Sequence, residues 1–302
     1  MNQKVISFLV SIIVTLLPLT SFGSMELSPA PEPPGQSSSI LSSGKTETLK
    51  IMSFNVLGVG TGDRSPENRL SGVAQTIRDQ LPDSFGLQEA SDYWRWTLKE
   101  ELSDLYAEAG NYGRHLGLNE GTPIFYLKDK FVCLAQGVFW LSDRPLLYSN
   151  GWDTSVPRIA AWALLVDKAT GFAYIHYNTH FDHIGELART NSAALMTEKL
   201  NSVKLPAVLT GDFNCKPDSV AYSYFTAGGL ADARLLAAKA DKGRTYHGYK
   251  GEDIRTGQPI DFIFTRQSCL ESVESYAIIH TQYGGQYPSD HFAIMATLTL
   301  KN

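Results

Sequence analysis

The chain has 302 residues, of which 43% are hydrophobic and 19% are charged, and its formal net charge is −5. This length and apolar share suffice for one large α/β domain. The negative charge and the absence of Lys/Arg runs argue against a protein that grips long duplex nucleic acid, because such proteins carry a basic stripe. A local basic patch inside the fold stays compatible with this composition.

The N-terminal segment has the pattern of a secretory signal. Lys4 precedes an apolar run over residues 5–17, and Ser21-Phe22-Gly23 forms a small-x-small cleavage site. The apolar run is shorter than the ~20 residues that a membrane-spanning helix needs. We therefore expect residues 1–23 to be a signal peptide. The mature protein is then exported to the periplasm or the exterior, without insertion into a membrane.

The next segment, residues 24–47, is rich in Pro and Ser. Such a composition buries too little apolar area to offset its ordering entropy, so this segment is expected to be a disordered tether. Residues 48–302 then form a single folded domain. Three cysteines, an odd number in an exported chain, leave at least one thiol free and make no disulfide scaffold. They are Cys133, Cys215 and Cys269.

Strands and helices are both expected after residue 48, in mixed order. Strands are predicted at 49–56, 84–87, 124–127, 131–141, 159–166, 172–179, 207–210, 260–265, 275–280 and 292–300, and helices at 70–81, 93–105, 187–200 and 222–230. Trp94, Trp96, Trp140 and Trp162 are expected in the core.

Two pairs of these strands are predicted to be hairpins: 124–127 with 131–141, and 159–166 with 172–179. Hairpins among helices argue against a doubly wound parallel sheet. They favour two mixed sheets packed face to face with helices outside, which is a four-layer α/β/β/α sandwich. A plain α+β sandwich of another family is the alternative.

Polar residues gather in short islands that end or follow apolar runs. In chain order the islands are Ser53-Phe54-Asn55, Gln88-Glu89, Asn178-Thr179-His180, Gly211-Asp212-Phe213-Asn214, Ile260-Asp261-Phe262 and Ser289-Asp290-His291. Strand ends with acidic, amide and imidazole side chains bring metal ligands and proton-transfer groups to one cleft. Carboxylate and amide oxygens suit a hard cation such as Mg²⁺.

Taken in this order, the islands resemble the motifs of the endonuclease/exonuclease/phosphatase superfamily. The resemblance covers nearly the whole segment from Leu49 to Leu300. The superfamily includes deoxyribonucleases, abasic-site endonucleases, inositol polyphosphate 5-phosphatases, sphingomyelinases and deadenylases. The resemblance implies the four-layer deoxyribonuclease-like sandwich and metal-dependent hydrolysis of phosphate esters. The segments Gly137–Ser142 and Asn178–His183 are most similar to an exported bacterial branch near the deadenylase-like group.

The resemblance implies a metal site for Mg²⁺ or Mn²⁺. Glu89 matches the main ligand, Asn55 offers an amide oxygen, and Asp290 binds the ion directly or through water. Two of these residues also have a simpler interpretation. Glu89 is then a solvated strand end, and Asn55 forms a turn before the glycines that follow it.

The resemblance also implies the catalytic residues. Asp212 matches the residue that orients and deprotonates the attacking water, and Asn214 matches a donor to the phosphate. Asp261 and His291 match the superfamily's Asp–His pair, in which a carboxylate fixes the imidazole and raises its basicity. His180 is expected to donate to a phosphate oxygen. Without the resemblance, Gly-Asp-x-Asn is also a common composition for a tight turn.

Substrate contacts are expected from residues near the islands. Arg158 is placed to clamp a phosphate through its planar guanidinium. Asp182 and His183 are also candidates for substrate contacts, with a bystander as the alternative interpretation of His183. Arg114 and Glu120, with Tyr112 and Trp152, are candidates for a specificity pocket.

Together these residues indicate metal-assisted, in-line attack of water at phosphorus. The preferred interpretation is an exported phosphodiesterase with nuclease-like chemistry, followed by a phosphomonoesterase that acts on sugar, polyol or nucleotide phosphates. Substrates are then small molecules or short nucleic acids, and the protein is expected to be a monomer. A catalytically silent module that binds a phosphorylated ligand is the alternative from another class.

Overall fold

The computed structural model describes residues 44–110, 121–250 and 256–302. Its elements in chain order are β1 (Thr46–Asn55), η1 (Gly62–Arg64), α2 (Pro66–Gln80), β2 (Ser84–Gln88), α3 (Asp92–Glu101), β3 (Tyr106–Ala109), β4 (Ile124–Leu127), β5 (Phe131–Trp140), β6 (Ile159–Asp167), β7 (Ala173–His180), α4 (Glu186–Ser202), β8 (Ala207–Asp212), α5 (Val220–Ala227), β9 (Leu230–Asp232), α6 (Ala233–Leu236), β10 (Ala237–Ala240), β11 (Asp261–Arg266), η2 (Gln267–Cys269), β12 (Leu270–Ile279) and β13 (Ala293–Lys301).

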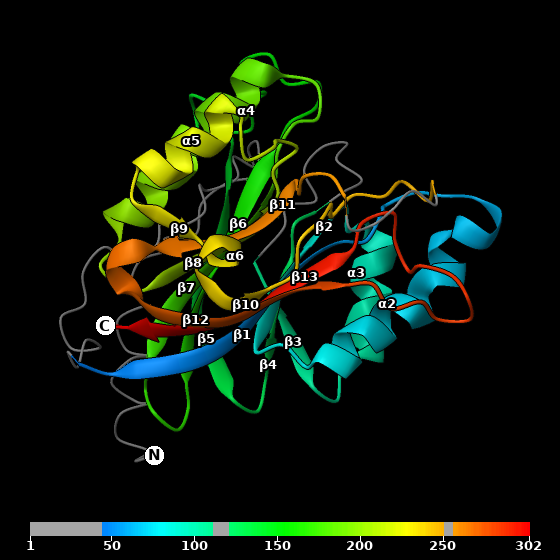
Figure 1. Ribbon diagram of the computed structural model, residues 1–302, viewed down its shortest axis with the longest axis horizontal. Coiled ribbons are helices and arrows are strands. Elements are labelled where there is room, and N and C mark those ends of the chain that lie inside the picture. The colour runs from blue at the N-terminus through cyan, green and yellow to red at the C-terminus, as the bar shows by residue number, and fades with distance from the viewer. Residues whose placement is uncertain (1–43, 111–120, 251–255) are drawn as a thin grey trace, which may run out of the picture.

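The strands form two mixed sheets (Figure 1). The first sheet has the order β10-β12-β13-β1-β2-β4-β3, and the second has the order β5-β6-β7-β8-β11-β9. β1 runs parallel to β2 and β7 runs parallel to β8, whereas β13 and β11 lie antiparallel to β1 and β8. This architecture confirms the predicted pair of mixed sheets flanked by helices.

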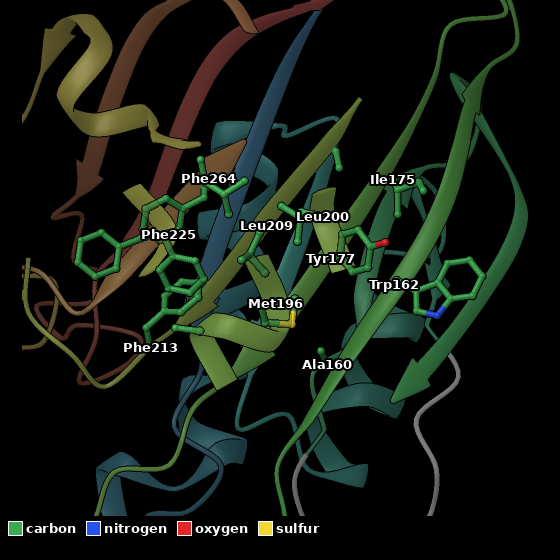
Figure 2. Close-up of a cluster of buried hydrophobic side chains, with 14 of the residues drawn as sticks. Ala160, Trp162, Ile175, Tyr177, Met196, Leu200, Leu209, Phe213, Phe225 and Phe264 are labelled. Atoms are coloured by element: carbon green, nitrogen blue, oxygen red, sulfur yellow. The ribbon is translucent and has the colours of Figure 1, made fainter. Parts of the chain in front are cut away.

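Three buried apolar clusters join the four layers. One packs α2 and α3 on the outer face of the first sheet, through residues such as Phe85 and Trp94. A second fills the space between the sheets, with Ile51 and Tyr174 among its members. The third packs α4 and α5 on the second sheet, and Figure 2 shows Met196 of α4 among its side chains. Burial of this apolar area is the main favourable contribution to folding.

The rows of side chains that face the space between the sheets change from apolar to polar along the strands. In β1 the row runs from Leu49 and Ile51 to Ser53 and Asn55, because alternate residues of a strand share a face. The polar part of these rows is a hydrogen-bonded layer. It comprises Ser53, Ser84, Gln88, His176, Asn178 and Thr210. This layer connects the apolar core to the polar ends of the strands.

One predicted hairpin was wrong. β4 and β5 are consecutive along the chain but belong to different sheets, since β4 pairs with β2 and β3, and β5 pairs with β6. The chain crosses from one sheet to the other after Lys130, and Phe131 enters the cluster between them. The hairpin of β6 and β7 is confirmed.

The burial of one tryptophan and the ends of two helices also differ from the sequence-based expectation. Trp96 was expected in the core but is 65% exposed, whereas Trp94, Trp140 and Trp162 are buried. α3 ends at Glu101, and α5 ends before two glycines, so that Leu230 begins β9 instead.

β1 begins at Thr46, within the segment assigned to the tether. The predicted signal peptide lies outside the described residues. Among the helices of the described part of the chain, none has the length and hydropathy to cross a membrane.

The buried imidazole of His176 predicts a dependence of stability on pH. Its ring bonds Ser84 Oγ at 2.8 Å and Thr210 Oγ1 at 2.9 Å, and burial lowers its pKa from 6.5 to about 3. The unfolded chain therefore takes up the proton first as the pH falls. The contribution of His176 to stability is full above pH 6.5, and between pH 6.5 and about 3 it falls by about 1.4 kcal/mol per pH unit.

In urea unfolding at pH 7, 5.5 and 4.5, His176→Gln should show a shallower loss of unfolding free energy than the unsubstituted protein. Glutamine keeps an amide in the polar layer but takes up no proton. Equal slopes for the two proteins would show that His176 is not the titrating group.

Candidate active site

The polar islands meet where strands of the two sheets end. Asn55 and His180 end β1 and β7, and Asp212 ends β8. His180 is the register partner of Asp212 across the parallel pair, and Asp261 is its partner across the antiparallel pair. His291 stands just ahead of β13. The topology therefore places residues from distant parts of the chain around Asp212.

Asp212 lies at the centre of the site and is almost fully buried. Its Oδ2 accepts from Asn55 Nδ2 at 3.0 Å, and the Nε2 atoms of His180 and His291 each lie 3.6 Å from it. Its Oδ1 accepts the backbone N–H of Asn214 at 2.9 Å. Burial and the charge of Asp261 raise the pKa of Asp212, while the charge of His291 opposes the rise. A carboxylate with a raised pKa is suited to take a proton.

His291 forms the expected pair with Asp261. Its Nδ1 lies 2.9 Å from Asp261 Oδ2, and both side chains are buried. Burial lowers the pKa of His291, but the charges of Asp261 and Asp212 outweigh it and raise this pKa to about 10. At neutral pH the imidazole is thus a cation whose Nδ1–H is fixed by Asp261, and its Nε2–H is directed toward Asp212.

His180 is held as a neutral donor beside Arg158. Arg158 Nη1 lies 3.0 Å from His180 Nδ1, and because a guanidinium only donates, Nδ1 accepts and the ring proton sits on Nε2. Burial and the charge of Arg158 lower the pKa of His180 well below its usual value. Asn214 Nδ2 donates to Phe181 O at 3.0 Å. These three side chains bring N–H groups together, as an anion requires.

Asp182 organises the surrounding loops. Its side chain is 1% exposed, and its oxygens accept from Thr154, Ser155, Ile184 and Gly185. It also lies 3.8 Å from Arg158 Nε. The geometry thus assigns Asp182 to positioning Arg158, in place of the substrate contact expected from the sequence. His183 is exposed and lies on the other guanidinium nitrogen, with Nδ1 3.3 Å from Arg158 Nη2.

The oxygen ligands expected for a cation lie on the Asn55 side of the site. Glu89 accepts from Asn55 Nδ2 at 2.9 Å through Oε1 and from the backbone N–H of Gly58 through Oε2. Burial raises the pKa of Asp290, His291 opposes the rise, and the carboxylate of Glu89 adds to it. Two carboxylates that repel each other and offer only oxygen fit a hard divalent cation.

Asn55 departs from the expected orientation. Its amide nitrogen faces the carboxylates of Glu89 and Asp212, and its Oδ1 accepts from the backbone N–H of Leu57 at 3.0 Å. Ligation through oxygen requires the amide to turn over.

A second group of acidic and imidazole side chains has metal-site spacing. One ligand atom each from Asp212, Asp261 and His291 lies within 4.8 Å of the others. A metal ligand must be a neutral imidazole, yet both nitrogens of His291 are engaged by carboxylates and its pKa is raised. The arrangement therefore favours proton transfer at this group and cation binding at Glu89 and Asp290.

Two residues of the site have strained backbones. Glu89 and Asn214 adopt φ angles of 55° and 47°, which lie in the left-handed region. Such conformations persist only where the surrounding structure enforces them, and they gather at functional sites. Here they turn the side chains of Glu89 and Asn214 away from the directions that a continued strand gives.

Sequence reasoning missed Tyr246. Its ring packs on His291 with centroids 4.9 Å apart, and it is 43% exposed. Thr245, its neighbour, accepts the backbone N–H groups of Ile260 and Asp261 through Oγ1. The aromatic and polar string Arg244–Tyr249, just ahead of the Asp261 island, is the signal that points to this segment.

Some other predicted residues are not tested by this geometry. Arg114, Glu120 and Tyr112 lie outside the described residues.

Cys215 packs in the apolar cluster of the second sheet, and burial raises its thiol pKa to about 11, which agrees with a structural role. The thiols of all three cysteines are free.

Comparison with known proteins identifies the relatives of this chain. The sequence profile of the Endonuclease/Exonuclease/phosphatase family matches residues 52–291. Nocturnin from Mus musculus is 20% identical over 285 residues, which cover 82% of this chain and 64% of that protein. The expected similarity to the deadenylase-like group is confirmed by this match.

Two solved bacterial structures are more similar. An endonuclease/exonuclease/phosphatase family protein from Bacteroides thetaiotaomicron is 33% identical with a TM-score of 0.78, over 85% of this chain and 100% of that one. The mannosyl-6-phosphatase Bt3783 of the same organism is 33% identical with a TM-score of 0.76, over 83% and 99%. The predicted four-layer sandwich is confirmed by these neighbours.

The geometry around Glu89 predicts where a cation binds. In calorimetric titration with Mg²⁺, Glu89→Gln should weaken binding at least tenfold, because it removes a charged oxygen ligand. Glu198→Gln, an equivalent change at an exposed position of α4, should leave the affinity as it is. Equal affinities in the two variants would place the cation elsewhere.

Proposed function

The chain belongs to the endonuclease/exonuclease/phosphatase family, and we propose that it is a metal-dependent hydrolase of phosphate monoesters borne by a sugar or a similar polyol. Family members act on phosphate esters. The observation that carries the proposal is the convergence of Asn55, His180 and His291 on the buried carboxylate of Asp212. This convergence combines a proton acceptor with donors for an anion in one place.

The phosphate is bound by the N–H groups opposite Asp212. Arg158, His180 and Asn214 present donors at neighbouring strand ends. Arg158 donates to His180 Nδ1 at 3.0 Å, and Asn214 is held by its bond to Phe181 O at 3.0 Å. Preorganised donors stabilise the charge that develops on the equatorial oxygens without reorganising during the reaction. A terminal phosphate offers more negative charge to this set than a diester does.

Asp212 orients the attacking water and accepts its proton. It is buried, its raised pKa favours proton uptake, and Asn55 and Asn214 hold both of its oxygens in place. A water on its Oδ2 is oriented and gives up its proton as it attacks phosphorus.

His291 supplies positive charge on the other side of Asp212. Its Nε2–H points into the site while Asp261 holds Nδ1, so the imidazolium offsets charge on the phosphorane oxygens. The alcohol departs on the side opposite the attacking water and takes its proton from solvent. Tyr246 shields one face of the ring.

Glu89 and Asp290 would hold the divalent cation, while Asn55 keeps its amide N–H groups on Glu89 and Asp212. Such a cation polarises a phosphate oxygen and neutralises part of its charge. Mg²⁺ uses few protein carboxylates and keeps several waters, which agrees with this sparse ligand set.

The choice of a sugar monoester reverses the order expected from the sequence, where a phosphodiester came first. Support comes from the 33% identity with a mannosyl-6-phosphatase over 83% of the chain. The net charge of −5 also speaks against long nucleic acid as a substrate. Phosphodiester hydrolysis and a silent binding module are the competing outcomes. Export through residues 1–23 is part of the proposal and is supported by the sequence pattern alone.

The test is hydrolysis of p-nitrophenyl phosphate and bis-p-nitrophenyl phosphate by the purified protein with Mg²⁺, Mn²⁺ or EDTA. We expect metal-dependent release that is faster from the monoester. Asp261→Asn should lower kcat by about 10²–10³, the usual effect of losing one preorganised charged group. Asp218→Asn, an exposed acid on the loop after Asp212, is the matched control and should keep the activity.

Faster release from the diester would reject the monoesterase in favour of a phosphodiesterase. Absence of release with every cation, together with intact phosphate binding, would support the silent module.

A further inference from the structure

Arg158 is the last residue of a sharply turned segment that lies against the N-terminus of α4. This segment, the strap of residues 151–158, leads directly into β6. The backbone N–H of Thr154 donates to Gly151 O at 2.9 Å, and Trp152 between them adopts a φ of 52°, in the left-handed region. A turn of this kind persists only where its surroundings hold it in place.

The start of α4 has no capping side chain of its own. Its N-cap is Gly185, although a side chain at this position commonly accepts a hydrogen bond from the second or third N–H of the helix. Asp153 of the strap takes this role instead. Its Oδ1 accepts the backbone N–H of Ala188 at 2.6 Å, and its Oδ2 accepts that of Leu187 at 3.2 Å. Because the helix dipole also favours a carboxylate there, this contact docks the strap on α4.

Glycine is required at position 185 for this docking. A Cβ atom there would lie 2.5 Å from Asp153 Oδ1 and 2.7 Å from Asp153 O. The φ angle of Gly185 is −69°, so the requirement comes from the close approach of the strap and not from the backbone conformation. The helix start thus lacks its own cap and leaves room for a carboxylate of the strap.

The docked strap determines which groups Asp182 contacts. Ser155 donates to Asp182 Oδ2 from its backbone N–H at 3.0 Å and from its Oγ at 2.6 Å. The same oxygen lies 3.8 Å from Arg158 Nε, which is beyond hydrogen-bond distance. While Ser155 occupies Oδ2, the guanidinium stays on His180, with Nη1 3.0 Å from Nδ1. Without these two donors, Oδ2 would draw the guanidinium toward itself and away from the phosphate position.

Resting on the proposed function, in which Arg158 binds the phosphate, we infer that Asp153 is a positioning residue for Arg158. Asp153 acts without touching the substrate. By docking the strap on α4 it keeps Ser155 on Asp182, and so it holds the guanidinium beside His180. An exposed aspartate outside the polar islands thereby sets the affinity of the site for phosphate.

The test is calorimetric titration of the protein with inorganic phosphate in the presence of Mg²⁺. Asp153→Ala should weaken phosphate binding about tenfold, which is the scale of one hydrogen bond to a charged group. Asp153→Asn keeps an acceptor oxygen for Ala188 and should restore most of the affinity. Asp167→Ala is the control, because Asp167 accepts two backbone N–H groups at the other end of β6, and it should leave the affinity unchanged.

A double-mutant cycle separates positioning of Arg158 from a general loss of structure. In an Arg158→Ala background, Asp153→Ala should change the phosphate affinity by less than about twofold, because the group that it positions is absent. Gly185→Ala displaces the strap while keeping the carboxylate, and it should weaken binding as Asp153→Ala does. It tests the same docking if Asp153→Ala does not fold.

An unchanged phosphate affinity in Asp153→Ala and Gly185→Ala would overturn the inference, as would a loss that persists in the Arg158→Ala background. Failure of the proposed function has a different signature, namely no metal-dependent release from p-nitrophenyl phosphate by the unsubstituted protein. Because phosphate binding is measured without turnover, the affinities of the variants decide the role of Asp153 in that case too.

Discussion

Two buried carboxylates face each other across neighbouring strands, and the arrangement of the site depends on the imidazole that they share. Asp212 and Asp261 are register partners in β8 and β11, where like charges destabilise a sheet. His291 relieves this repulsion, with Nδ1 2.9 Å from Asp261 and Nε2 3.6 Å from Asp212. The imidazolium of His291 therefore stabilises the pair of strands and also places a positive charge beside the Asp212 carboxylate. Hydrolysis of a phosphate ester needs both groups.

This arrangement needs both sheets at a fixed spacing. The carboxylates come from the second sheet, whereas His291 and Asn55 come from the first. At Gly86 of β2 the sheets approach so closely that a Cβ atom would lie 2.2 Å from Asn178 Oδ1 and 2.4 Å from Thr210 Oγ1. Non-bonded atoms do not approach this closely, so no side chain fits at this position and glycine is required. The polar layer at this level therefore sets the distances within the site.

Periodicity and motif order predicted much of this structure, because the strand ends carry the chemistry. The convergence of Asp212, Asp261 and His180 on one cleft was expected from the islands, but the strand register that pairs them was not. The partner sheet of β5 could not be predicted, since an apolar strand fits either sheet; in the structure β5 pairs with β6, and Phe131 packs between the two sheets. The prediction that Trp96 lies in the core was wrong, because the size and hydrophobicity of tryptophan suggest burial whatever the fold. Asp182 was expected to contact the substrate but is buried among loop contacts, and Tyr246 on His291 was not predicted. Burial and loop contacts, which no single sequence displays, decide these positions.

The central claim is that Asp261 and Asp212 keep His291 protonated at neutral pH. It is tested most directly by ¹⁵N NMR titration of the His291 imidazole in the folded protein with EDTA present, assigned with a His291→Asn variant. The account predicts that both ring nitrogens stay protonated through pH 8, in agreement with a pKa raised to about 10. A ring that loses its proton near its ordinary pKa of 6.5 would contradict it.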